Sequence, residues 1–263
     1  MVEVSFAADI LTMIEAQEFN ENINSNHDLM ITSCCCPIWV CMIKKDYNSF
    51  IKYTTPTVSP MIACGRILKK LNNDCTTVFI SPCVAKKKEA KEDDIKDAID
   101  YVITFEELND IFSALSIRIE EQQELPSILY AARGGLLYPT SGGICEAVSD
   151  MIKELYPEKI KLFKPTFVSG VKNCKEILNN ILTNDIDYTF VEGLACDGGC
   201  VGGPKVLKNK EETTIICHEK AYSQPIKLGI FSPVTLNVLE KVGINNYKEL
   251  NIPCKSNIFH RKF

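Results

Sequence analysis

Three short apolar runs along the chain each end directly in a loop that carries cysteine. The runs are rich in Val, Ile and Phe and cover residues 28–32, 76–80 and 188–192. The loops that follow them cover residues 33–37, 81–83 and 196–200. Apolar runs of this length that stop at Gly, Pro or Ser are typical of buried strands. Because open α/β sheets bind ligands beyond the carboxyl ends of their strands, we expect the three loops to bring their thiols to one place.

The rest of the pattern alternates helices with strands. Helical spacing and capping signals, including Ser232, predict helices over residues 6–23, 37–50, 105–115, 144–155, 172–182 and 233–243. A charged stretch predicts an exposed helix over 86–100. Further strands are expected over 101–104 and 161–169, and a Gly-rich loop is expected over 133–143. This alternation indicates an α/β fold with two lobes of mostly parallel sheet flanked by helices, and with the metal site in the cleft between the lobes. The approximate lobes are residues 1–124 and 125–263.

The composition describes a chain that can bury a sizeable core. Of its 263 residues, 46% are hydrophobic and 24% are charged, and the net charge of -5 argues against a nucleic-acid partner. No apolar run approaches the roughly 18 residues that a membrane span needs, so no membrane partner is expected. The odd number of 13 cysteines and the lack of a basic region before an apolar stretch favour free thiols in a reduced cytoplasm.

Thiols from three loops point first to an iron–sulfur cluster held by four thiolates. Glycines around Cys196 and Cys200 would let the backbone approach a cluster closely and would offer N–H donors to sulfur. Tetrahedral zinc is the alternative, although Cys83 has no partner nearby in the sequence, and unligated core thiols are a third possibility. The other cysteines are most simply small core hydrophobes, namely Cys41, Cys64, Cys75, Cys145, Cys174, Cys217 and Cys254.

The three cysteine loops resemble the signature segments of [FeFe]-hydrogenases, in the same order. That family has the patterns T-S-C-C-P-x-W, M-P-C-x-x-K-x-x-E and E-x-M-A-C-x-x-G-C-x-x-G-G-G. This chain has S-C-C-C-P-I-W at 33–39, S-P-C-V-A-K-K-K-E at 81–89 and E-G-L-A-C-D-G-G-C-V-G-G-P at 192–204. Weaker similarity extends through residues 6–9, 103–104 and 141–144.

The resemblance implies a single H-cluster domain over 1–263, without an auxiliary ferredoxin domain, that catalyses the reversible reduction of protons to H2. Its cofactor would be a [4Fe-4S] cubane linked to a di-iron subsite that carries carbonyl, cyanide and a bridging dithiolate. The implied cubane ligands are Cys36, Cys83, Cys196 and the bridging Cys200. Lys86 would donate to a cyanide ligand, and its alternative is a solvated lysine on a charged helix. The implied contacts of the cofactor also include Ser81, Pro82 and Gly142.

Proton delivery, by the same resemblance, would start at the Cys35 thiol and continue through Glu15 and Glu18, which share one face of the first helix. Thr55 stands where the family usually has a serine hydroxyl. Asn22 stands where the family usually has the arginine that ends the proton path. Taken without the resemblance, the two glutamates would be ordinary exposed helix residues.

The first cysteine loop allows two alignments. Aligning on Pro37 needs no gap, keeps Trp39 in place, and makes Cys36 the ligand and Cys35 the relay thiol. Aligning on residues 32–33 demands an insertion and would move both roles one residue earlier, onto Cys34 and Cys35. We prefer the alignment on the proline.

Three departures from the pattern keep other functions open. Ser81, Leu194 and Cys145 stand where the family usually has methionine, and such contacts tune a metal centre. A hydrogen or redox sensor with low turnover is therefore one alternative, and a non-catalytic iron–sulfur assembly factor is another. The implied partners are H2 and protons, a ferredoxin-like electron carrier or a separate electron-transfer subunit, and hydrogenase maturation proteins.

Overall fold

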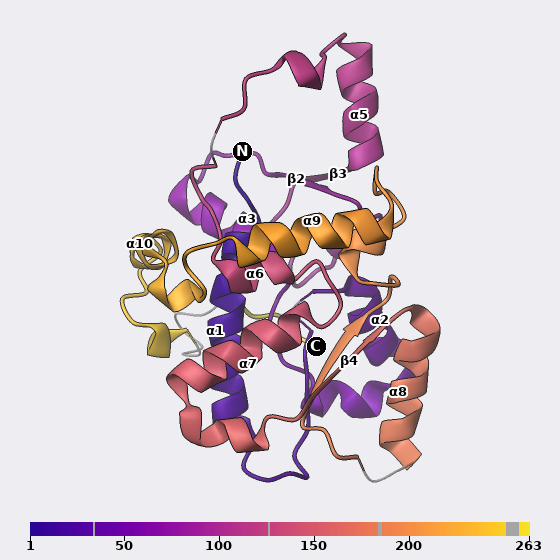
Figure 1. The fold of residues 1–263 in the computed structure, drawn as a ribbon, viewed down its shortest axis with the longest axis vertical. Helices are drawn as coiled ribbons and strands as arrows, with labels where there is room; N and C mark the ends of the chain where they lie inside the picture. Colours follow the sequence, from indigo (N-terminus) through magenta and orange to yellow (C-terminus); the bar gives the residue numbers. More distant parts are fainter. Residues whose placement is uncertain (34, 126, 184–185, 251–257) are drawn as a thin grey trace.

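Two separate parallel sheets make up the β-structure of the described residues, as the alternating pattern predicts (Figure 1). The computed structural model describes residues 1–33, 35–125, 127–183, 186–250 and 258–263. One sheet has the order β1–β5–β4, with the bounds Met30–Ile31, Phe190–Leu194 and Pro165–Ser169. The other pairs β2 (Val78–Ser81) with β3 (Tyr101–Thr104). Because neighbouring strands are parallel, their carboxyl ends meet at one edge of each sheet.

Strand β5 is the centre of the larger sheet and is buried along its whole length. Its register places Val191 opposite Ile31 of β1 and Glu192 opposite Phe167 of β4. A buried strand needs hydrogen-bond partners along both edges, and β1 from the amino-terminal part of the chain supplies one of them. The sheets therefore do not divide at the predicted lobe boundary between 124 and 125.

Helices cover both sheets and surround a central helix, α1 (Ser5–Asn22) (Figure 1). All residues of α1 from Phe6 to Phe19 are buried, as is typical of a helix enclosed by the protein. The other helices are α2 (Pro37–Asp46), α3 (Pro60–Leu71), α4 (Lys86–Glu89), α5 (Phe105–Ala114), α6 (Arg133–Leu137), α7 (Gly143–Leu155), α8 (Val171–Thr183), α9 (Lys210–Tyr222) and α10 (Pro233–Lys241). Helix α1 contacts α3, α6, α7 and α10, and α8 packs against β4.

Most predicted elements are present with slightly shifted ends. The strand predicted over 101–104 is β3, and it leads into α5 through a capping box formed by Thr104 and Glu107. The Ser232 hydroxyl caps α10 as predicted, since it accepts a hydrogen bond from the backbone N–H of Thr235. The Gly-rich segment over 133–143 contains the short helix α6.

Two of the sequence predictions near the cysteine loops are wrong. The helix predicted over 37–50 ends at Asp46, and Phe50 lies in a separate 3-10 segment, Asn48–Tyr53. The run at 76–80 is not a buried strand, because Val78 in β2 is 51% exposed. A sheet of only two strands leaves part of its surface open, whereas β5 has partners on both sides.

The exposed helix predicted over 86–100 is also wrong. Only α4 is helical in this segment, and both Lys86 and Glu89 are buried. Acidic residues that would have extended the helix pair with basic residues far away in the sequence: Asp97 bonds to Arg66, and Glu92 bonds to Arg261. Tertiary pairing overrides a local helical tendency here.

Besides α6, two further helices were not predicted. Helix α3 follows Ser59 and has Pro60 at its first position, which is a start signal that the sequence does carry. Helix α9 is capped by Asn209, but among its residues only Ala221 is buried, so its apolar periodicity is weak.

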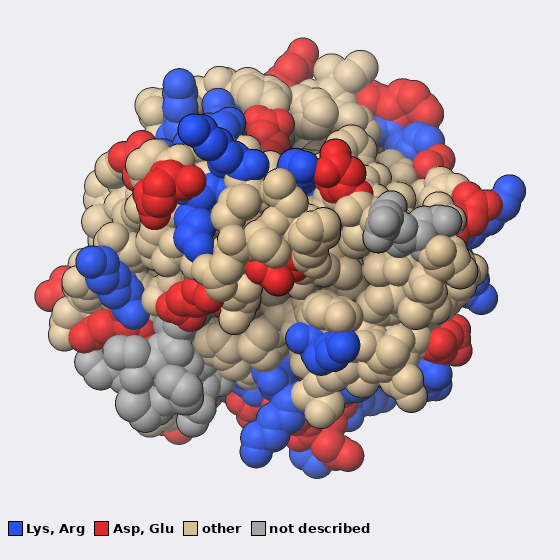
Figure 2. Space-filling model, turned by 90° about the horizontal axis from the view of Figure 1, so that it is seen from below, with Lys and Arg blue, Asp and Glu red and all other residues tan. Residues whose placement is uncertain are grey.

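The surface mixes charges of both signs. On the face shown in Figure 2, basic and acidic side chains alternate around a broad uncharged area rather than forming one basic patch. Within the described residues, no helix combines the length and the hydropathy that a bilayer crossing requires.

The contact between β5 and α2 gives a test of the fold. A Cβ on Gly193 would lie 2.3 Å from the Trp39 ring, whose indole N–H donates to the Thr32 carbonyl ahead of the first cysteine loop. We expect Gly193→Ala to lower the free energy of unfolding by about 1–3 kcal/mol through overpacking. Urea unfolding of the protein without cofactor measures this change.

Gly134→Ala is the matched control, because its Cβ would meet its nearest neighbour at an ordinary 3.4 Å. Its unfolding free energy should be unchanged or slightly higher. Equal unfolding midpoints for both variants would contradict the packing role given to Gly193.

Candidate metal centre

The cysteine loops follow β1, β2 and β5, and their thiols lie close enough to influence one another's ionisation. Burial, and after it the thiols of Cys36, Cys200 and Cys83, together raise the pKa of Cys196 to about 11. These four residues come from all three loops. The structure thus brings together the four cysteines that were expected to converge.

Cys36 faces the loop that follows β5. Its Sγ accepts a hydrogen bond from the backbone N–H of Ala195 at 3.4 Å. Burial raises the pKa of this thiol, and the charge of Cys200 adds to the effect. The glycine N–H groups expected to donate to sulfur bond to oxygen instead, since Gly198 donates to the Ser169 hydroxyl and Gly199 to the Cys196 carbonyl.

Cys200 differs from the other thiols because its pKa is lowered. The largest cause is a hydrogen bond from the Cys35 side chain, which outweighs burial, and the Lys86 ammonium acts in the same direction. Cys35 therefore lies beside Cys200, while its neighbour Cys36 lies beside Ala195. Cys34, to which the second alignment would give one of the two roles, lies outside the described residues.

The thiol arrangement fits a cluster better than a single ion. Among the described residues, no three His, Cys, Asp or Glu side chains are grouped to hold one metal ion. A cubane instead takes one thiolate on each of four irons, which suits thiols spread around a common space. Neighbouring thiols raise the pKa of Cys196 and of Cys36, so cations are needed nearby before all four cysteines can ionise.

A mainly apolar cavity of about 400 Å³ lies next to Cys200. Its walls include predicted site residues from all three loops, namely Cys35, Ser81, Pro82, Cys83, Lys86 and Cys200. Residues of both sheets' loops thus meet at one cavity. Gly142 is not among the lining residues.

The Lys86 ammonium is buried in the cavity wall rather than solvated. It forms an ion pair with Glu89 at 2.6 Å and donates to the Cys35 carbonyl at 3.1 Å. Burial alone would lower the pKa of Lys86, but attraction to Glu89 and to the thiols of Cys35 and Cys83 raises it. Lys86 is therefore a fixed cation in apolar surroundings.

Both glutamates of the expected relay are buried rather than exposed. The carboxylate of Glu15 accepts hydrogen bonds from the hydroxyls of Thr32 at 2.5 Å and Thr55 at 3.2 Å. Glu18 accepts one from the Thr57 hydroxyl at 3.2 Å, and burial raises its pKa. The hydroxyl of Thr55 thus contacts Glu15 at the position where the family usually has serine.

Backbone contacts hold the third cysteine loop in place. Gly198 and Gly199 have φ values of 78° and 99°, which side chains rarely adopt, and a Cβ on Gly199 would lie 2.6 Å from the Pro139 carbonyl. The N–H of Gly142 donates to the buried Glu192 carboxylate at 2.8 Å. Gly142 therefore contacts the scaffold of the site and not the cavity.

Sequence reasoning missed several residues around the cavity. Glu89, the partner of Lys86, belongs to the second cysteine motif, but the motif alone does not indicate that it pairs with the lysine. Cys217 of α9 lines the cavity, so its interpretation as a core hydrophobe is wrong, and Cys41 and Cys75 are only half-buried. The helical spacing of apolar residues over Pro60–Leu71 could have predicted α3. In contrast, no pattern within residues 210–222 indicates that α9 lines the cavity. Cys64, Cys145 and Cys174 are buried as expected, and Cys254 lies outside the described residues.

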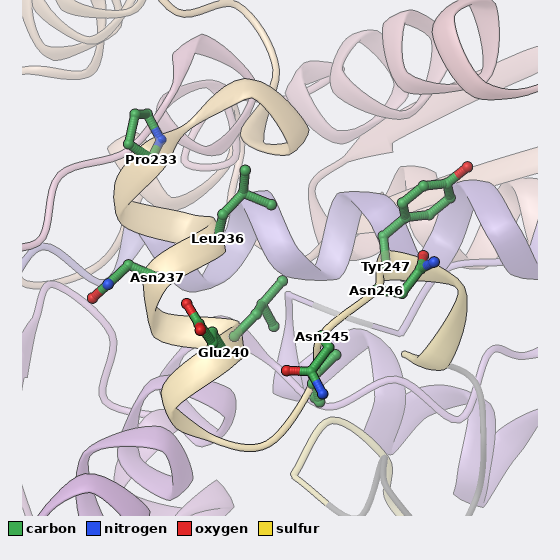
Figure 3. Close-up of a pocket in the computed structure, with 9 residues that line it drawn as sticks. Pro233, Leu236, Asn237, Glu240, Asn245, Asn246 and Tyr247 are labelled. Atoms are coloured by element: carbon green, nitrogen blue, oxygen red, sulfur yellow. The ribbon is translucent and has the colours of Figure 1, made fainter.

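Figure 3 shows another pocket, of about 510 Å³, between α10 and residues 244–247. Leu236 and Glu240 on the helix lie opposite Asn245 and Tyr247. Its lining includes no cysteine or histidine. The cavity beside Cys200 is lined by cysteines and this pocket is not, so we place the candidate metal centre at the cavity beside Cys200.

Residues 1–204 match the family described as iron only hydrogenase large subunit, C-terminal domain. The chain belongs to this family. The match covers the three cysteine loops and ends before α9 and α10 begin.

The similar curated proteins include both hydrogenases and assembly factors. Iron hydrogenase 1 of Clostridium pasteurianum is 26% identical over 76% of this chain and 42% of its own length. A probable cytosolic Fe-S cluster assembly factor of Drosophila erecta is 26% identical over 74% of this chain and 51% of its own length. Protein NAR1 of Arabidopsis thaliana is 23% identical over 79% of this chain and 57% of its own length. The chain thus spans about half the length of these relatives.

Solved structures confirm the fold. An [FeFe]-hydrogenase structure that reveals stepwise H-cluster assembly, HydA(deltaEFG), superposes with a TM-score of 0.76 at 21% identity. A variant of HydA1 from Chlamydomonas reinhardtii superposes with a TM-score of 0.73 at 20% identity. Each comparison covers 100% of this chain and 83% of the other. The predicted α/β fold with parallel sheets is therefore correct.

Helix α6 lines the cavity through Gly135 and is held by a buried acid, Asp9. The Asp9 carboxylate accepts hydrogen bonds from the N–H groups of Ala132 at 2.7 Å and Gly135 at 2.8 Å. Burial nevertheless raises the pKa of Asp9 to about 7. A carboxylate at the start of a helix stabilises the helix, whereas removing that carboxylate from water is unfavourable. Asp9 is subject to both effects.

The raised pKa predicts a pH dependence of stability. An acid with a raised pKa stabilises the fold below its unfolded pKa of 3.8, and this contribution is lost as the pH rises through about 7. Each pKa unit corresponds to about 1.4 kcal/mol, so wild-type unfolding free energy should fall by a few kcal/mol over this range. Asp9→Asn should remove the part of that fall that belongs to Asp9 and leave the part that belongs to Glu192, whose pKa burial also raises to about 7, as measured by urea unfolding at several pH values.

Asp28→Asn is the control, because hydrogen bonds from the backbone N–H groups of Asn24 and Ser25 lower the pKa of this acid. Asp28 is ionised in both states above about pH 5, so its substitution should leave the slope between pH 5 and 7 unchanged. An unchanged slope in Asp9→Asn would contradict the assignment to Asp9.

Proposed function

We propose that this domain binds a [4Fe-4S] cubane joined through Cys200 to a di-iron subsite, and that it catalyses the reversible reduction of protons to H2. The observation that carries the proposal is the apolar cavity beside Cys200, with the buried Lys86 ammonium in its wall. When bound, the di-iron subsite would supply the metal chemistry of hydrogen, with carbonyl, cyanide and a bridging dithiolate as its other ligands. Lys86 would hold an anionic cyanide, because a charge-assisted hydrogen bond is stronger away from water.

The proposed cubane ligands are Cys36, Cys83, Cys196 and Cys200. Their mutual influence on ionisation supports this set. The alignment on the proline is supported by the different surroundings of two neighbours, since Cys36 bonds to Ala195 while Cys35 lines the cavity. Ser81 and Pro82 line the same cavity and would contact the di-iron subsite. Gly142 does not line the cavity, and it would affect the cofactor only indirectly, through its hydrogen bond to Glu192.

For proton delivery, we propose that the Cys35 thiol exchanges protons at the cavity and that Glu15 and Glu18 carry them onward. Cys35 has the position for this role, because it lines the cavity and bonds to Cys200. The two glutamates are buried along α1 and are bonded to hydroxyl groups. Groups that can both give and accept a proton are what such a path requires.

A hydrogen or redox sensor with low turnover is the second candidate. Ser81 replaces a usual methionine in the cavity wall, and Leu194 and Cys145 replace two others. A non-catalytic assembly factor is the third, since such proteins are among the relatives. The positions of Lys86 and Cys35 in the cavity wall favour the enzyme.

The wider setting follows from the same proposal. Residues 1–263 would act as a single H-cluster domain, and electrons would come from a ferredoxin-like carrier or a separate electron-transfer subunit. Hydrogenase maturation proteins would install the di-iron subsite. The free thiols of the described cysteines are in keeping with a reduced cytoplasm.

Infrared spectroscopy of anaerobically matured protein tests the cofactor. We expect carbonyl and cyanide stretching bands in the wild type, as both the enzyme and the sensor require. Cys36→Ala should lose them together with the cubane iron, because it removes one of the four thiolates. Iron and sulfide analysis of the same samples measures the cubane.

Cys64→Ala is the matched control, because Cys64 is a buried thiol that burial alone affects. It should keep the full iron content and both sets of bands. A full iron content in Cys36→Ala would show that the alignment on the proline is wrong, and a wild type without carbonyl bands would leave only the assembly factor.

Hydrogen turnover separates the enzyme from the sensor and tests Cys35. We expect Cys35→Ala to keep the infrared bands but to lose about 100-fold or more in H2 evolution and uptake, as is usual when a proton-transferring group is removed. Measurable wild-type turnover supports the enzyme. Unchanged turnover in Cys35→Ala would refute the role of this thiol.

A further inference from the structure

The buried acids of α1 continue beyond the cavity toward the opposite surface. The hydroxyl of Ser33 lies 3.2 Å from the Thr55 hydroxyl, which donates to Glu15, and it donates to the Thr57 carbonyl at 2.7 Å. The Thr57 hydroxyl donates in turn to Glu18. A belt of buried polar groups thus runs from the first cysteine loop to Glu18, and it needs an outlet if protons are to pass along it.

The carboxyl-terminal segment lies against the end of this belt. Its backbone pairs with residues 56–58 in antiparallel fashion, with Val58 donating to the Phe259 carbonyl at 2.9 Å and Arg261 donating to the Pro56 carbonyl at 2.7 Å. This pairing sets His260 directly opposite Thr57. Phe259 is fully buried beneath the segment, so the position of His260 is fixed by packing as well as by hydrogen bonds.

The His260 side chain connects Glu18 to solvent. Its Nε2 lies 3.6 Å from Glu18 Oε1, and the imidazole is 21% exposed whereas the glutamate side chain is only 8% exposed. The same histidine lines a surface pocket of about 540 Å³. Asn22, which stands in place of the family's usual arginine, has an amide that does not titrate near neutral pH.

We propose that His260 is the group at which the buried acids of α1 exchange protons with solvent. This inference rests on the proposed function, because it gives the proton path of that reaction its outlet. In H2 uptake, a proton leaves the Glu18 carboxyl for His260 Nε2, and the resulting imidazolium releases a proton to water in the pocket. H2 evolution reverses both transfers. The transfer requires this 3.6 Å contact to shorten, and catalytic hydrogen bonds are often long in resting structures and tighten during the reaction.

The pocket surrounds His260 with charges of both signs. The charged side chains that line it are Arg66, Lys69, Asp94, Asp97, Arg261 and Lys262. Most of this charge is already paired: Arg66 bonds to Asp97, and Arg261 bonds to Asp94 and Glu92. Glu18 is the acid in contact with the imidazole from the buried side, so its ionisation should have the largest effect on His260.

Nuclear magnetic resonance of the protein without cofactor tests the pair directly. The chain has only three histidines, so each ring signal can be assigned by substitution. We expect Glu18→Gln to shift the titration midpoint of His260 to lower pH, because the imidazolium loses its carboxylate partner. The ring signals of the exposed His27 are the internal control, since Glu18→Gln should leave them unchanged. An unchanged His260 midpoint would overturn the pairing.

Turnover of the matured enzyme tests the outlet. His260→Ala and His260→Gln should both keep the infrared bands and lose turnover, approaching the roughly 100-fold cost of removing a proton-transferring group. Added imidazole should restore His260→Ala, because the substitution opens space beside Glu18 that the surface pocket connects to solvent. His27→Ala is the matched control and should show wild-type turnover with no response to imidazole.

The outcomes separate this inference from the function on which it rests. Wild-type turnover in His260→Gln, or a loss in His260→Ala that imidazole does not restore, would overturn the outlet while leaving the hydrogenase function intact. A wild type without carbonyl bands or turnover would overturn the proposed function, and the resonance titration alone would then decide whether Glu18 and His260 form a coupled pair.

Discussion

The gathering of four half-buried cysteines near one another is the constraint on which the rest of this structure depends. Cys36, Cys83 and Cys200 each raise the pKa of Cys196, so every ionised thiol makes the next ionisation harder. Cations reverse this effect. The chain supplies one such cation, the Lys86 ammonium, whose charge lowers the pKa of Cys200. The iron of a cluster would supply the rest of the positive charge. A buried lysine with its own counter-ion, Glu89, is part of the same electrostatic balance.

This balance requires loops that cannot spread apart. The third cysteine loop is fastened by its glycines to residues 139–141, and Trp39 packs directly on Gly193 while it bonds to the Thr32 carbonyl. The thiols are therefore positioned by close backbone contacts between distant parts of the sequence. Such preorganisation suits a site in which small displacements change ligand geometry.

Helix α1 combines structural and chemical roles. Its apolar residues form the centre of the core, yet it also buries Asp9, Glu15 and Glu18. Burying carboxyl groups is unfavourable unless hydrogen bonds compensate, and each of these three accepts such bonds. Asp9 anchors the helix that lines the cavity, whereas the two glutamates lie along the proposed proton path.

The sequence alone determined what depends on local pattern and on residue chemistry. Strand ends, the extent of α1, the cap of α10 and the convergence of the cysteine loops all follow from periodicity, capping residues and the rule for parallel strands. Only the tertiary structure decided that Lys86 and Glu89 are buried, that α4 stops after one turn, that Cys217 faces the cavity and that His260 reaches Glu18. These features depend on which distant segments pack together, and a local pattern does not encode the partner of a charge or the side of a helix that another element will cover.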